Sequence, residues 1–502
     1  MILGVILQSC VSSKSSFNPN KKYSLSQIEK DYSVFEDMLQ ESHPSLYWYT
    51  PKDSLDHFFR WGAEQLKDSM TEPEFRKILA YVISKIDCGH TSVRASKKYS
   101  SYQDTLRTKI FPFSMKLWGD KTSPVSDTMV IALNLNRRDS VLKRGTVIEK
   151  INGLASGLII DSLFNFLSAD GHNRTHKFQT LSNRGSFGSL YTSVFGLPDK
   201  FQVDYVDERG QVKSTIVSSY NPTTDSSFRT FIRPLVRQPR PTRREIKQMQ
   251  LPAIRSLRID SVNNTAFMDL NSFGRGFHLK KFFRESFRSL RKNKTQYLII
   301  DVRGNGGGSV TNSTFLSRFI SDHLFKVADS LYAVSRKNHY GRYMQNYFWN
   351  RLFMFFFTKK RPDNHYHFGY YERHRFHPKK NNHFNERVYI LSGGNSFSAT
   401  TLFISAVNKQ ENVTTVGEET GGGAYGNTAW LIPDVTLPNT RIRFRLPLFR
   451  LVMDKNNPKT GLGVQPKIEV DPTVDAIRRN ADYKLDKVME LIRSEKARKE
   501  NR

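Results

Sequence analysis

Apolar side chains recur at helical spacing near the start of the chain. Four of them follow one another at intervals of three or four positions: Ile28, Tyr32, Phe35 and Leu39. This spacing predicts an amphipathic helix whose start is capped by Ser24 or Ser26. The runs "SLDHFFRWGAEQL" and "TEPEFRKILAYVISKI" predict two more helices, and Thr71 with Glu74 forms a capping box. We therefore expect a helical N-terminal domain at residues 23–100.

The pattern changes to short β-rich runs at residues 108–222. "MVIALNL" and "GTVIEKING" predict strands, and "FQVDYVDERGQVKSTIV" predicts a hairpin with "DERG" as its turn. Residues 223–253 are rich in Pro and Arg, and this composition predicts a linker.

Strands alternate with helical patterns at residues 254–475, as in "QYLIIDVR" followed by "NSTFLSRFI". This alternation predicts an α/β fold. An aromatic and basic insertion at residues 335–385 contains "LFMFFFTKK". We interpret this run as a lid or core helix, although apolar residues flanked by lysines also suit a membrane interface. Residues 476–502 predict a charged C-terminal helix.

The chain of 502 residues is strongly basic. Lys and Arg number 77 against 47 Asp and Glu, a formal net charge of +30, and 38 % of the residues are hydrophobic. This hydrophobic content is enough for a large core and excludes a disordered chain. Because the charge is spread along the sequence and no nucleic-acid-binding motif is present, we expect no nucleic-acid partner.

The two cysteines, Cys10 and Cys88, exclude a disulfide framework. Cys10 ends "MILGVILQSC", which resembles the end of a bacterial lipoprotein signal in which the cysteine is lipidated. The basic start of such signals is missing, so we expect a truncated signal at residues 1–10 and a polar linker at 11–22. The alternative is an apolar N-terminus without a signal. The lipoprotein interpretation predicts a periplasm-facing protein of the bacterial cell envelope, held at the membrane by its lipid anchor.

The first of two glycine-rich turns is a candidate site for binding an anion or stabilising an oxyanion. "YLIIDVRGNGGGSV" is an apolar strand that runs into Gly306, Gly307 and Gly308. Consecutive glycines expose backbone N–H groups that bind anions or stabilise an oxyanion, and the alternative is a tight turn. A phosphate-binding loop is excluded because no Lys-Ser or Lys-Thr pair follows, and the contiguous glycines do not fit a dinucleotide fingerprint.

A second strand and turn, "VYILSGGNSFSATTLFISAVNK", places Ser396 and Ser398 at the start of a helix. The positive potential of a helix N-terminus suits a nucleophile whose attack creates negative charge. A helix cap is the other interpretation of either serine.

Four blocks together resemble the tail-specific, or C-terminal processing, serine peptidase family. "LIIDVRGNGGG", "SFSAT", "TVGEETGGGA" and "GVQPKIEVDP" come in the order of that family and span residues 297–472. The resemblance implies a crotonase-like ββα spiral for residues 254–475, a PDZ-like domain at 108–222 around "LKRGTVIEKING", and a polypeptide substrate. It also implies that Ser398 is the nucleophile. We expect no cofactor.

The resemblance departs from the best-known branch, which uses a Ser-Lys dyad. The position of that lysine falls on Gly423, and residues 410–454 contain no lysine. "KIDCGHTSV" resembles instead the Asp-Gly-His-Thr segment of the tricorn-like branch, with Cys88 inserted, so the resemblance makes His90 the general base. A histidine that is neutral at pH 7 suits this role. We expect Ala399, Gly306 and Gly307 to form the oxyanion hole.

The carboxylate that orients His90 is left open, because the family's glutamate is missing from "NPKTGLG". The candidates are Glu469, which we favour, and Glu418, Glu419 and Asp87, with a bare Ser-His dyad as the alternative.

The alternative function is a catalytically inactive ligand- or peptide-binding lipoprotein on the same fold. Cys88 is expected to be a buried thiol rather than a nucleophile. Four histidines have a spacing that zinc could use, but their basic surroundings argue against a metal: His365, His367, His374 and His377.

Overall fold

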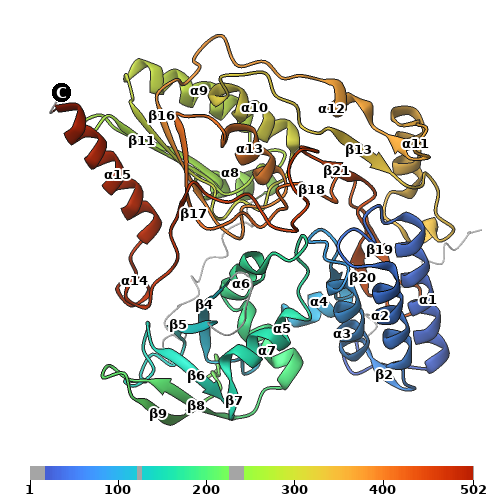
Figure 1. Cartoon of the computed structure of the whole chain (residues 1–502). Helices are drawn as coiled ribbons and strands as arrows, with labels where there is room; N and C mark the ends of the chain where they lie inside the picture. Colours follow the sequence, from blue (N-terminus) through green and yellow to red (C-terminus); the bar gives the residue numbers. More distant parts are fainter. Residues whose placement is uncertain (1–16, 121–126, 225–241, 501–502) are drawn as a thin grey trace, which may run out of the picture.

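The computed structural model describes residues 17–120, 127–224 and 242–500. The predicted signal with Cys10 lies outside these residues. Figure 1 shows a bundle of helices in blue, a β-rich part in cyan and green, and a larger α/β part in yellow to red. The mixed α/β class agrees with the prediction from the sequence.

The N-terminal part is a bundle of helices, as predicted. Its helices are α1 (Leu25–Ser42), α2 (Lys52–Glu64), α3 (Glu72–Ser84) and α4 (Lys97–Gln103), and its strands are β1 (Lys22–Tyr23), β2 (Met70–Thr71) and β3 (Val93–Arg94). The four periodic residues of α1 are all buried. The Thr71 N–H donates to Glu74 Oε2 at 2.7 Å, which confirms the capping box.

The β-rich part is an antiparallel sheet in the order β4-β5-β6-β8-β9, with β7 paired to β6. The strands are β4 (Phe113–Trp118), β5 (Thr128–Asn134), β6 (Val147–Ile151), β7 (Leu154–Ala155), β8 (Lys200–Val206) and β9 (Val212–Ser218). Three helices accompany them: α5 (Ser156–Phe164), α6 (Arg174–Ser182) and α7 (Ser186–Phe195). Gly210 closes the predicted hairpin turn, where its N–H donates to Asp207 O at 3.0 Å.

The segment predicted as a linker contains a helix, α8 (Arg243–Ile254). Thr242 caps it by accepting the Glu245 N–H at 3.3 Å, and the Thr242 N–H donates to Glu245 Oε2 at 2.7 Å. This reciprocal pair stabilises the first turn of a sequence whose prolines and arginines otherwise suggested a linker.

The α/β part is built on a sheet in the order β10-β11-β12-β16-β17-β22, parallel from β11 onward. Its strands are β10 (Arg255–Asp260), β11 (Thr265–Leu270), β12 (Tyr297–Asp301), β16 (Arg387–Ser392), β17 (Val413–Gly417) and β22 (Ile468–Glu469). Alternate residues of β12 face opposite sides of the sheet. Leu298 and Ile300 pack against helices on one side. Tyr297 and Ile299 pack against a different helix on the other side.

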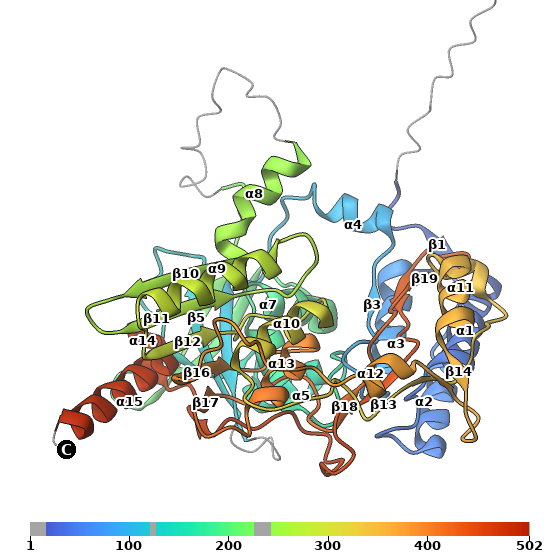
Figure 2. The same cartoon turned by 90° about the horizontal axis from the view of Figure 1, so that it is seen from above.

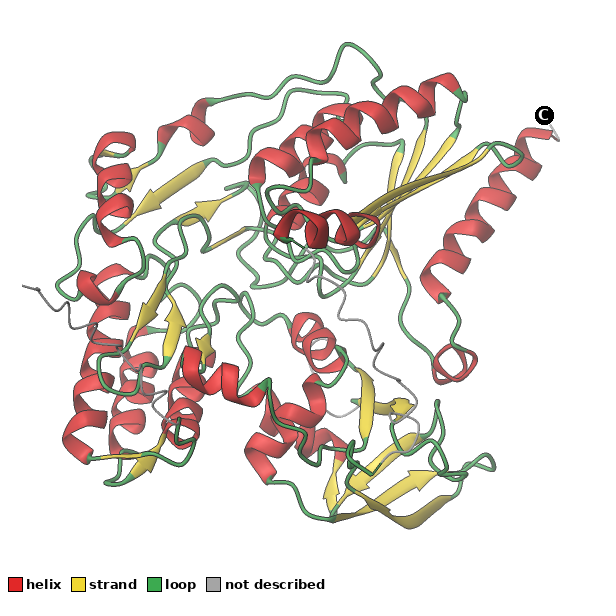
Figure 3. Ribbon diagram, turned by 180° about the vertical axis from the view of Figure 1, so that it is seen from behind, coloured by secondary structure: helices red, strands yellow, loops and turns green. Residues whose placement is uncertain are grey.

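Helices cover both faces of this sheet (Figures 1 and 3). One face packs against α9 (Leu279–Lys292), α10 (Val310–Ile320) and α13 (Ala399–Val407), and the other against α15 (Tyr483–Glu500). The predicted single C-terminal helix is divided, because Asn480 adopts φ 55° and ends α14 (Val474–Arg479). No helix among the described residues is both long and apolar enough to span a membrane.

Two smaller sheets complete the fold; the first lies entirely within the α/β part, and the second joins this part to the N-terminal part. One has the order β14-β15-β13-β21-β18, and the other, β19-β20-β3, pairs Arg443 with Arg94 of the N-terminal part. Their strands are β13 (Ser330–Ala333), β14 (Lys359–Lys360), β15 (Tyr366–His367), β18 (Gly426–Asn427), β19 (Asp434–Thr436), β20 (Arg443–Arg445) and β21 (Arg450–Val452). The insertion at residues 335–385 supplies a 3₁₀ turn (Gly341–Tyr343), α11 (Tyr347–Phe357) and α12 (Gly369–Arg373).

A buried ion pair attaches the C-terminal helix to the sheet. Lys484 Nζ donates to Glu418 Oε2 at 2.5 Å and to Ser392 O at 3.0 Å, and both charged residues are buried. We expect Lys484→Met to lower the free energy of unfolding by about 3–5 kcal/mol, because it deprives a buried carboxylate of its cation. Urea titration at pH 7 measures this loss.

The matched control is Lys487→Met, which removes a surface pair with Glu490 on the same helix. This control is expected to cost at most about 1 kcal/mol. Equal losses in the two variants would contradict the role of the buried pair.

Candidate active site

Ser398 lies at the turn between strand β16 and helix α13. Its backbone has φ 59° and ψ −121°, a conformation that costs a residue with a side chain about 1–3 kcal/mol. Although α13 begins at the next residue, the Ser398 side chain makes no capping hydrogen bond. The strained turn presents the hydroxyl to the cavity beside it, in the manner of serine nucleophiles on sharp strand-to-helix turns.

Ser396 has a structural role instead. Its Oγ donates to Val302 O at 2.8 Å and accepts the Gly393 N–H at 3.2 Å, and the residue is fully buried. Ser396 therefore fastens the turn before Ser398 to the end of strand β12.

The glycine-rich turn after β12 lies directly against Ser398. Gly307 has φ 94°, and a Cβ at this position would be 2.8 Å from Ser398 Cβ and 2.9 Å from Ala399 N. Only glycine permits this approach. The Gly307 and Ser398 turns are more than ninety residues apart in the sequence. The parallel pairing of β12 with β16 brings them together.

Some backbone N–H groups of these turns have no acceptor. The Gly307 N–H donates to Asn305 Oδ1 at 3.0 Å. Across the described chain, the N–H groups of Gly306, Gly308 and Ala399 donate to no acceptor. These donors are free to bind an oxygen that carries negative charge.

His90 is buried beside the turn that carries Ser398. Its ring lies 4.5 Å from the ring of Phe397, the neighbour of Ser398, and neither ring nitrogen has a hydrogen-bond partner among the described residues. Burial lowers the pKa of His90 to about 3, with smaller contributions from the positive charges of Arg445 and His176. His90 is therefore a neutral imidazole at physiological pH.

Asp170 provides the carboxylate beside His90. Asp170 Oδ1 lies 3.9 Å from His90 Nδ1 and accepts the Gly89 N–H at 2.8 Å, and Oδ2 accepts the Gly423 N–H at 3.4 Å. Burial raises the pKa of Asp170 to about 7, against the lowering effect of these two hydrogen bonds. Gly423, the position of the family's lysine, thus contacts a carboxylate.

The carboxylates considered from the sequence lie elsewhere. Glu469 is exposed on β22, where it pairs with Gly417, whereas the carboxylate within 4 Å of His90 is that of Asp170. The other candidates have structural partners: Glu418 binds Lys484, Glu419 accepts from Thr175, and Asp87 accepts from Thr50. Sequence reasoning missed Asp170, although "ADGH" at residues 169–172 contains an uninterrupted Asp-Gly-His.

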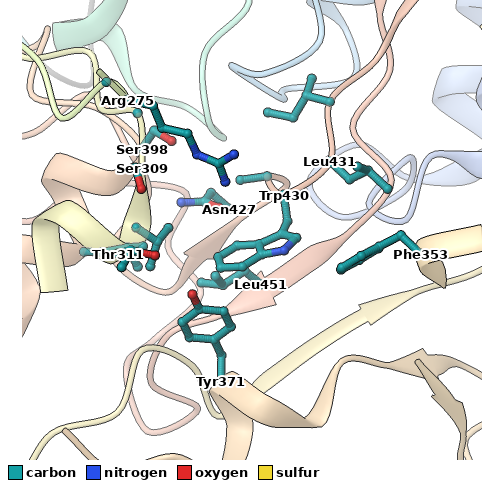
Figure 4. Close-up of a pocket in the computed structure, with 16 residues that line it drawn as sticks. Arg275, Ser309, Thr311, Phe353, Tyr371, Ser398, Asn427, Trp430, Leu431 and Leu451 are labelled. Carbon is teal, nitrogen blue, oxygen red and sulfur yellow. The ribbon is translucent and has the colours of Figure 1, made fainter. Parts of the chain in front are cut away.

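A cavity of about 640 Å³ opens beside Ser398 (Figure 4). Apolar and aromatic side chains form one wall, among them Phe353, Tyr371 and Trp430. Asn427 is buried in the lining, and both polar atoms of its side chain have no hydrogen-bond partner within the described residues. The Arg275 guanidinium points between Asn427 and Trp430 in Figure 4, so the cavity combines an apolar wall with polar groups near the serine.

Two other groups considered from the sequence have no role in this site. Burial raises the pKa of the Cys88 thiol to about 12, so it is not an ionised nucleophile. His367 Nδ1 and Nε2 contact Glu372 and Asp363, at 2.7 and 2.9 Å. The described part of the chain contains no group of three or more His, Cys, Asp or Glu residues that could hold a metal ion.

Comparisons with known proteins give one family match. Residues 264–470 match the model of peptidase family S41. No curated protein matches the chain.

Solved structures also resemble the chain. Mature CPAF complexed with lactacystin is 16 % identical, with a TM-score of 0.61 over 93 % of this chain and 98 % of that chain. The photosystem II D1 C-terminal processing protease is 10 % identical, with a TM-score of 0.40 over 91 % and 96 %. The tricorn protease is 13 % identical, with a TM-score of 0.37 over 94 % of this chain and 37 % of that chain.

Proposed function

We propose that this chain, whose residues 264–470 match the model of peptidase family S41, is a serine-type peptidase that hydrolyses polypeptides with Ser398 as nucleophile and His90 as general base. The observation that carries the proposal is the strained turn at Ser398, which holds an uncapped hydroxyl against the glycine-rich turn. We assign the catalytic domain to the crotonase-like spirals and the β-rich part, with its sheet and helix α5, to the PDZ-like domains.

The reaction follows from the positions of these groups. Ser398 Oγ attacks the scissile carbonyl carbon while its proton passes to the neutral His90 ring. The carbonyl oxygen becomes an oxyanion that Ala399 and the glycine-rich turn stabilise through backbone N–H groups. His90 returns the proton to the leaving amine as the C–N bond breaks, and a water molecule then hydrolyses the acyl-enzyme by the same route. The first step requires His90, which lies against Phe397 in the resting structure, to reach Ser398 Oγ.

Asp170 replaces Glu469 in this mechanism as the group that positions His90. Its two N–H donors, from Gly89 and Gly423, hold the carboxylate on the Nδ1 side of the imidazole ring. When His90 takes the proton of Ser398, an ionised Asp170 stabilises the imidazolium across a short distance in a buried setting.

The cavity indicates the class of substrate. Its aromatic wall suits a large apolar side chain next to the scissile bond, and the unpaired amide of Asn427 suits the substrate backbone. Arg275 is exposed and forms no ion pair within the described residues, so we expect it to favour an acidic group near the scissile bond.

We place this peptidase in the bacterial cell envelope as a periplasm-facing lipoprotein anchored through Cys10, with envelope proteins or peptides as substrates. The support is the resemblance of "MILGVILQSC" to a lipoprotein signal. The PDZ-like domain would present the polypeptide to Ser398.

A fluorophosphonate probe tests the nucleophile. We expect it to label the wild-type chain, to leave Ser398→Ala unlabelled, and to label His90→Ala at least about a hundredfold more slowly, because the hydroxyl then has no base. The matched control is Ser405→Ala on α13, whose hydroxyl has no hydrogen-bond partner among the described residues. Mass spectrometry of the labelled peptide reads the result. Labelling that persists in Ser398→Ala excludes the assignment, and a folded wild-type chain without labelling favours the peptide-binding alternative.

Asp170→Asn is expected to separate stability from activity. The folded-state pKa of Asp170, about 7, lies above its ordinary value, so the wild-type free energy of unfolding falls as the pH rises from about 4 to about 7. The variant lacks this penalty, and urea titration at pH 8 should find it more stable, by up to about 4 kcal/mol. Its kcat should nevertheless fall at least about tenfold, since the imidazolium loses its counter-charge.

The pH profile gives a second measurement of the same role. Wild-type kcat/KM should rise with pH through about 7 as Asp170 ionises, and Asp170→Asn should lack this rise. Glu469→Gln is the comparison, because Glu469 is exposed and away from His90. If Glu469→Gln loses activity and Asp170→Asn retains it, the assignment of Asp170 is wrong.

Arg275→Gln tests the substrate preference. We expect kcat/KM for peptides with an acidic residue next to the scissile bond to fall about three- to tenfold, with little change for neutral peptides of the same length. Arg291→Gln, an exposed arginine of α9, is the control. Equal effects on acidic and neutral peptides would contradict a carboxylate-binding role of Arg275.

A further inference from the structure

Helix α11 carries its apolar side chains on the outside of the molecule. Five aromatic residues each expose between 59 and 68 % of their surface: Phe348, Trp349, Phe355, Phe356 and Phe357. The buried residues of the helix are Asn350 and Met354. The interpretation of this run as a core helix is therefore wrong for most of its aromatic residues.

The exposed residues form one continuous stripe along the helix. Phe348 and Trp349 are followed at helical spacing by Leu352, and Leu352 is followed by Phe355 and Phe356. Helices of soluble proteins turn such a stripe toward the core, and scattered surface apolar residues do not line up in this way. Both views in Figures 1 and 2 place α11 at the periphery of the molecule.

Basic residues adjoin the stripe, since the Arg336 guanidinium lies 5.9 Å from the Phe355 ring. The insertion at residues 335–385 contains eleven Lys and Arg but only two acidic residues, Asp363 and Glu372. Both acidic groups are occupied, since Asp363 contacts His367 and Glu372 pairs with Arg361. Arg351 on the helix, and Lys359 and Lys360 on β14 beside it, are exposed and form no ion pair within the described chain.

An apolar stripe with a basic rim is complementary to an anionic lipid surface. The aromatic rings and the indole of Trp349 suit the boundary between headgroups and acyl chains, and unpaired Lys and Arg attract anionic headgroups. A helix of eleven residues is about 16 Å long, which is too short to cross a bilayer and suits a position in its plane.

A second copy of the chain is a poorer partner for the same face. A two-fold dimer would place the stripe against itself, and its basic rims would then face each other. Like charges at close range across such a contact are unfavourable.

We propose that α11 docks the protein on an anionic membrane, with its aromatic stripe in the interface and the basic residues Arg351, Lys359 and Lys360 on the headgroups. Phe353, on the inner side of the same helix, lines the cavity that contains Ser398. If the proposed peptidase function holds, docking brings this cavity to the membrane surface, where membrane-attached polypeptides would meet it.

Vesicle co-sedimentation tests the docking. The full chain would carry Cys10→Ser, so that no acyl group contributes to binding. We expect it to bind vesicles that contain phosphatidylglycerol and to bind pure phosphatidylcholine vesicles at least tenfold more weakly. The double substitution Phe355→Ser and Phe356→Ser should lower binding to the anionic vesicles at least tenfold, although it changes no charge.

The matched control is Val212→Ser with Ile216→Ser, a pair that is 63 and 70 % exposed on β9 and should bind as the parent does. Brominated phosphatidylglycerol should quench Trp349, and Trp349→Phe should remove this quenching while it retains binding. Circular dichroism checks the fold, and cleavage of a soluble peptide should be unchanged in the Phe355 and Phe356 variant.

Three results would overturn the proposal. The first is that the parent chain binds no vesicles. The second is that the Phe355 and Phe356 variant binds anionic vesicles as well as the parent does. The third is that the parent binds no vesicles but forms a concentration-dependent dimer, which the variant does not form. The second result would mean that net charge alone binds the vesicles, and the third would identify a second copy as the partner. None of these measurements requires peptidase activity, so each stands apart from the proposed function.

Discussion

One buried carboxylate joins the three parts of the molecule. Asp170 belongs to the β-rich part, yet it accepts the N–H of Gly89 from the N-terminal part and of Gly423 from the α/β part. Its neighbour Gly171 donates to Asp87 O at 2.9 Å, which strengthens the same junction. The position of His90 relative to Ser398 depends on this contact, because neither ring nitrogen of His90 has a hydrogen bond to any of the described residues.

The burial of Asp170 and His90 at this junction determines which protonation state each group prefers. Burial raises the pKa of Asp170 toward 7 and lowers the pKa of His90 toward 3, so each group disfavours its charged form at rest. In the proposed mechanism the two charges stabilise each other, because His90 receives a proton beside an ionised Asp170. The backbone strain at Ser398 is a second local cost at the same place, and pairing of β12 with β16 maintains it.

Much of this molecule could be predicted from the sequence. The periodic residues of α1, the capping box at Thr71 and the turn of the β8-β9 hairpin depend on neighbours within a few positions, and the structure confirms them. The adjacency of the Gly307 and Ser398 turns required the resemblance to a family, because a parallel sheet brings together residues that are distant in sequence.

Neither the carboxylate beside His90 nor the orientation of α11 could be predicted from local patterns. Asp170 contacts Gly89 across 81 positions and Gly423 across 253, and no local pattern reports such a contact. The apolar run "LFMFFFTKK" predicts a lid or core helix, but an apolar run does not say whether the core or the solvent receives its side chains.

The two unexpected features both lie near Ser398. Asp170 lies 3.9 Å from Nδ1 of His90, whose ring packs against Phe397, and Phe353 of α11 lines the cavity beside Ser398. The inner face of α11 is held by Asn350, whose side chain donates to Gln345 O at 3.0 Å, and by buried Met354, so the helix is fixed while its aromatic face remains exposed. An exposed apolar face on a fixed helix costs solubility without improving the core. Such a cost is expected to persist only where the face has a partner, and a partner at this place would lie beside the Ser398 cavity.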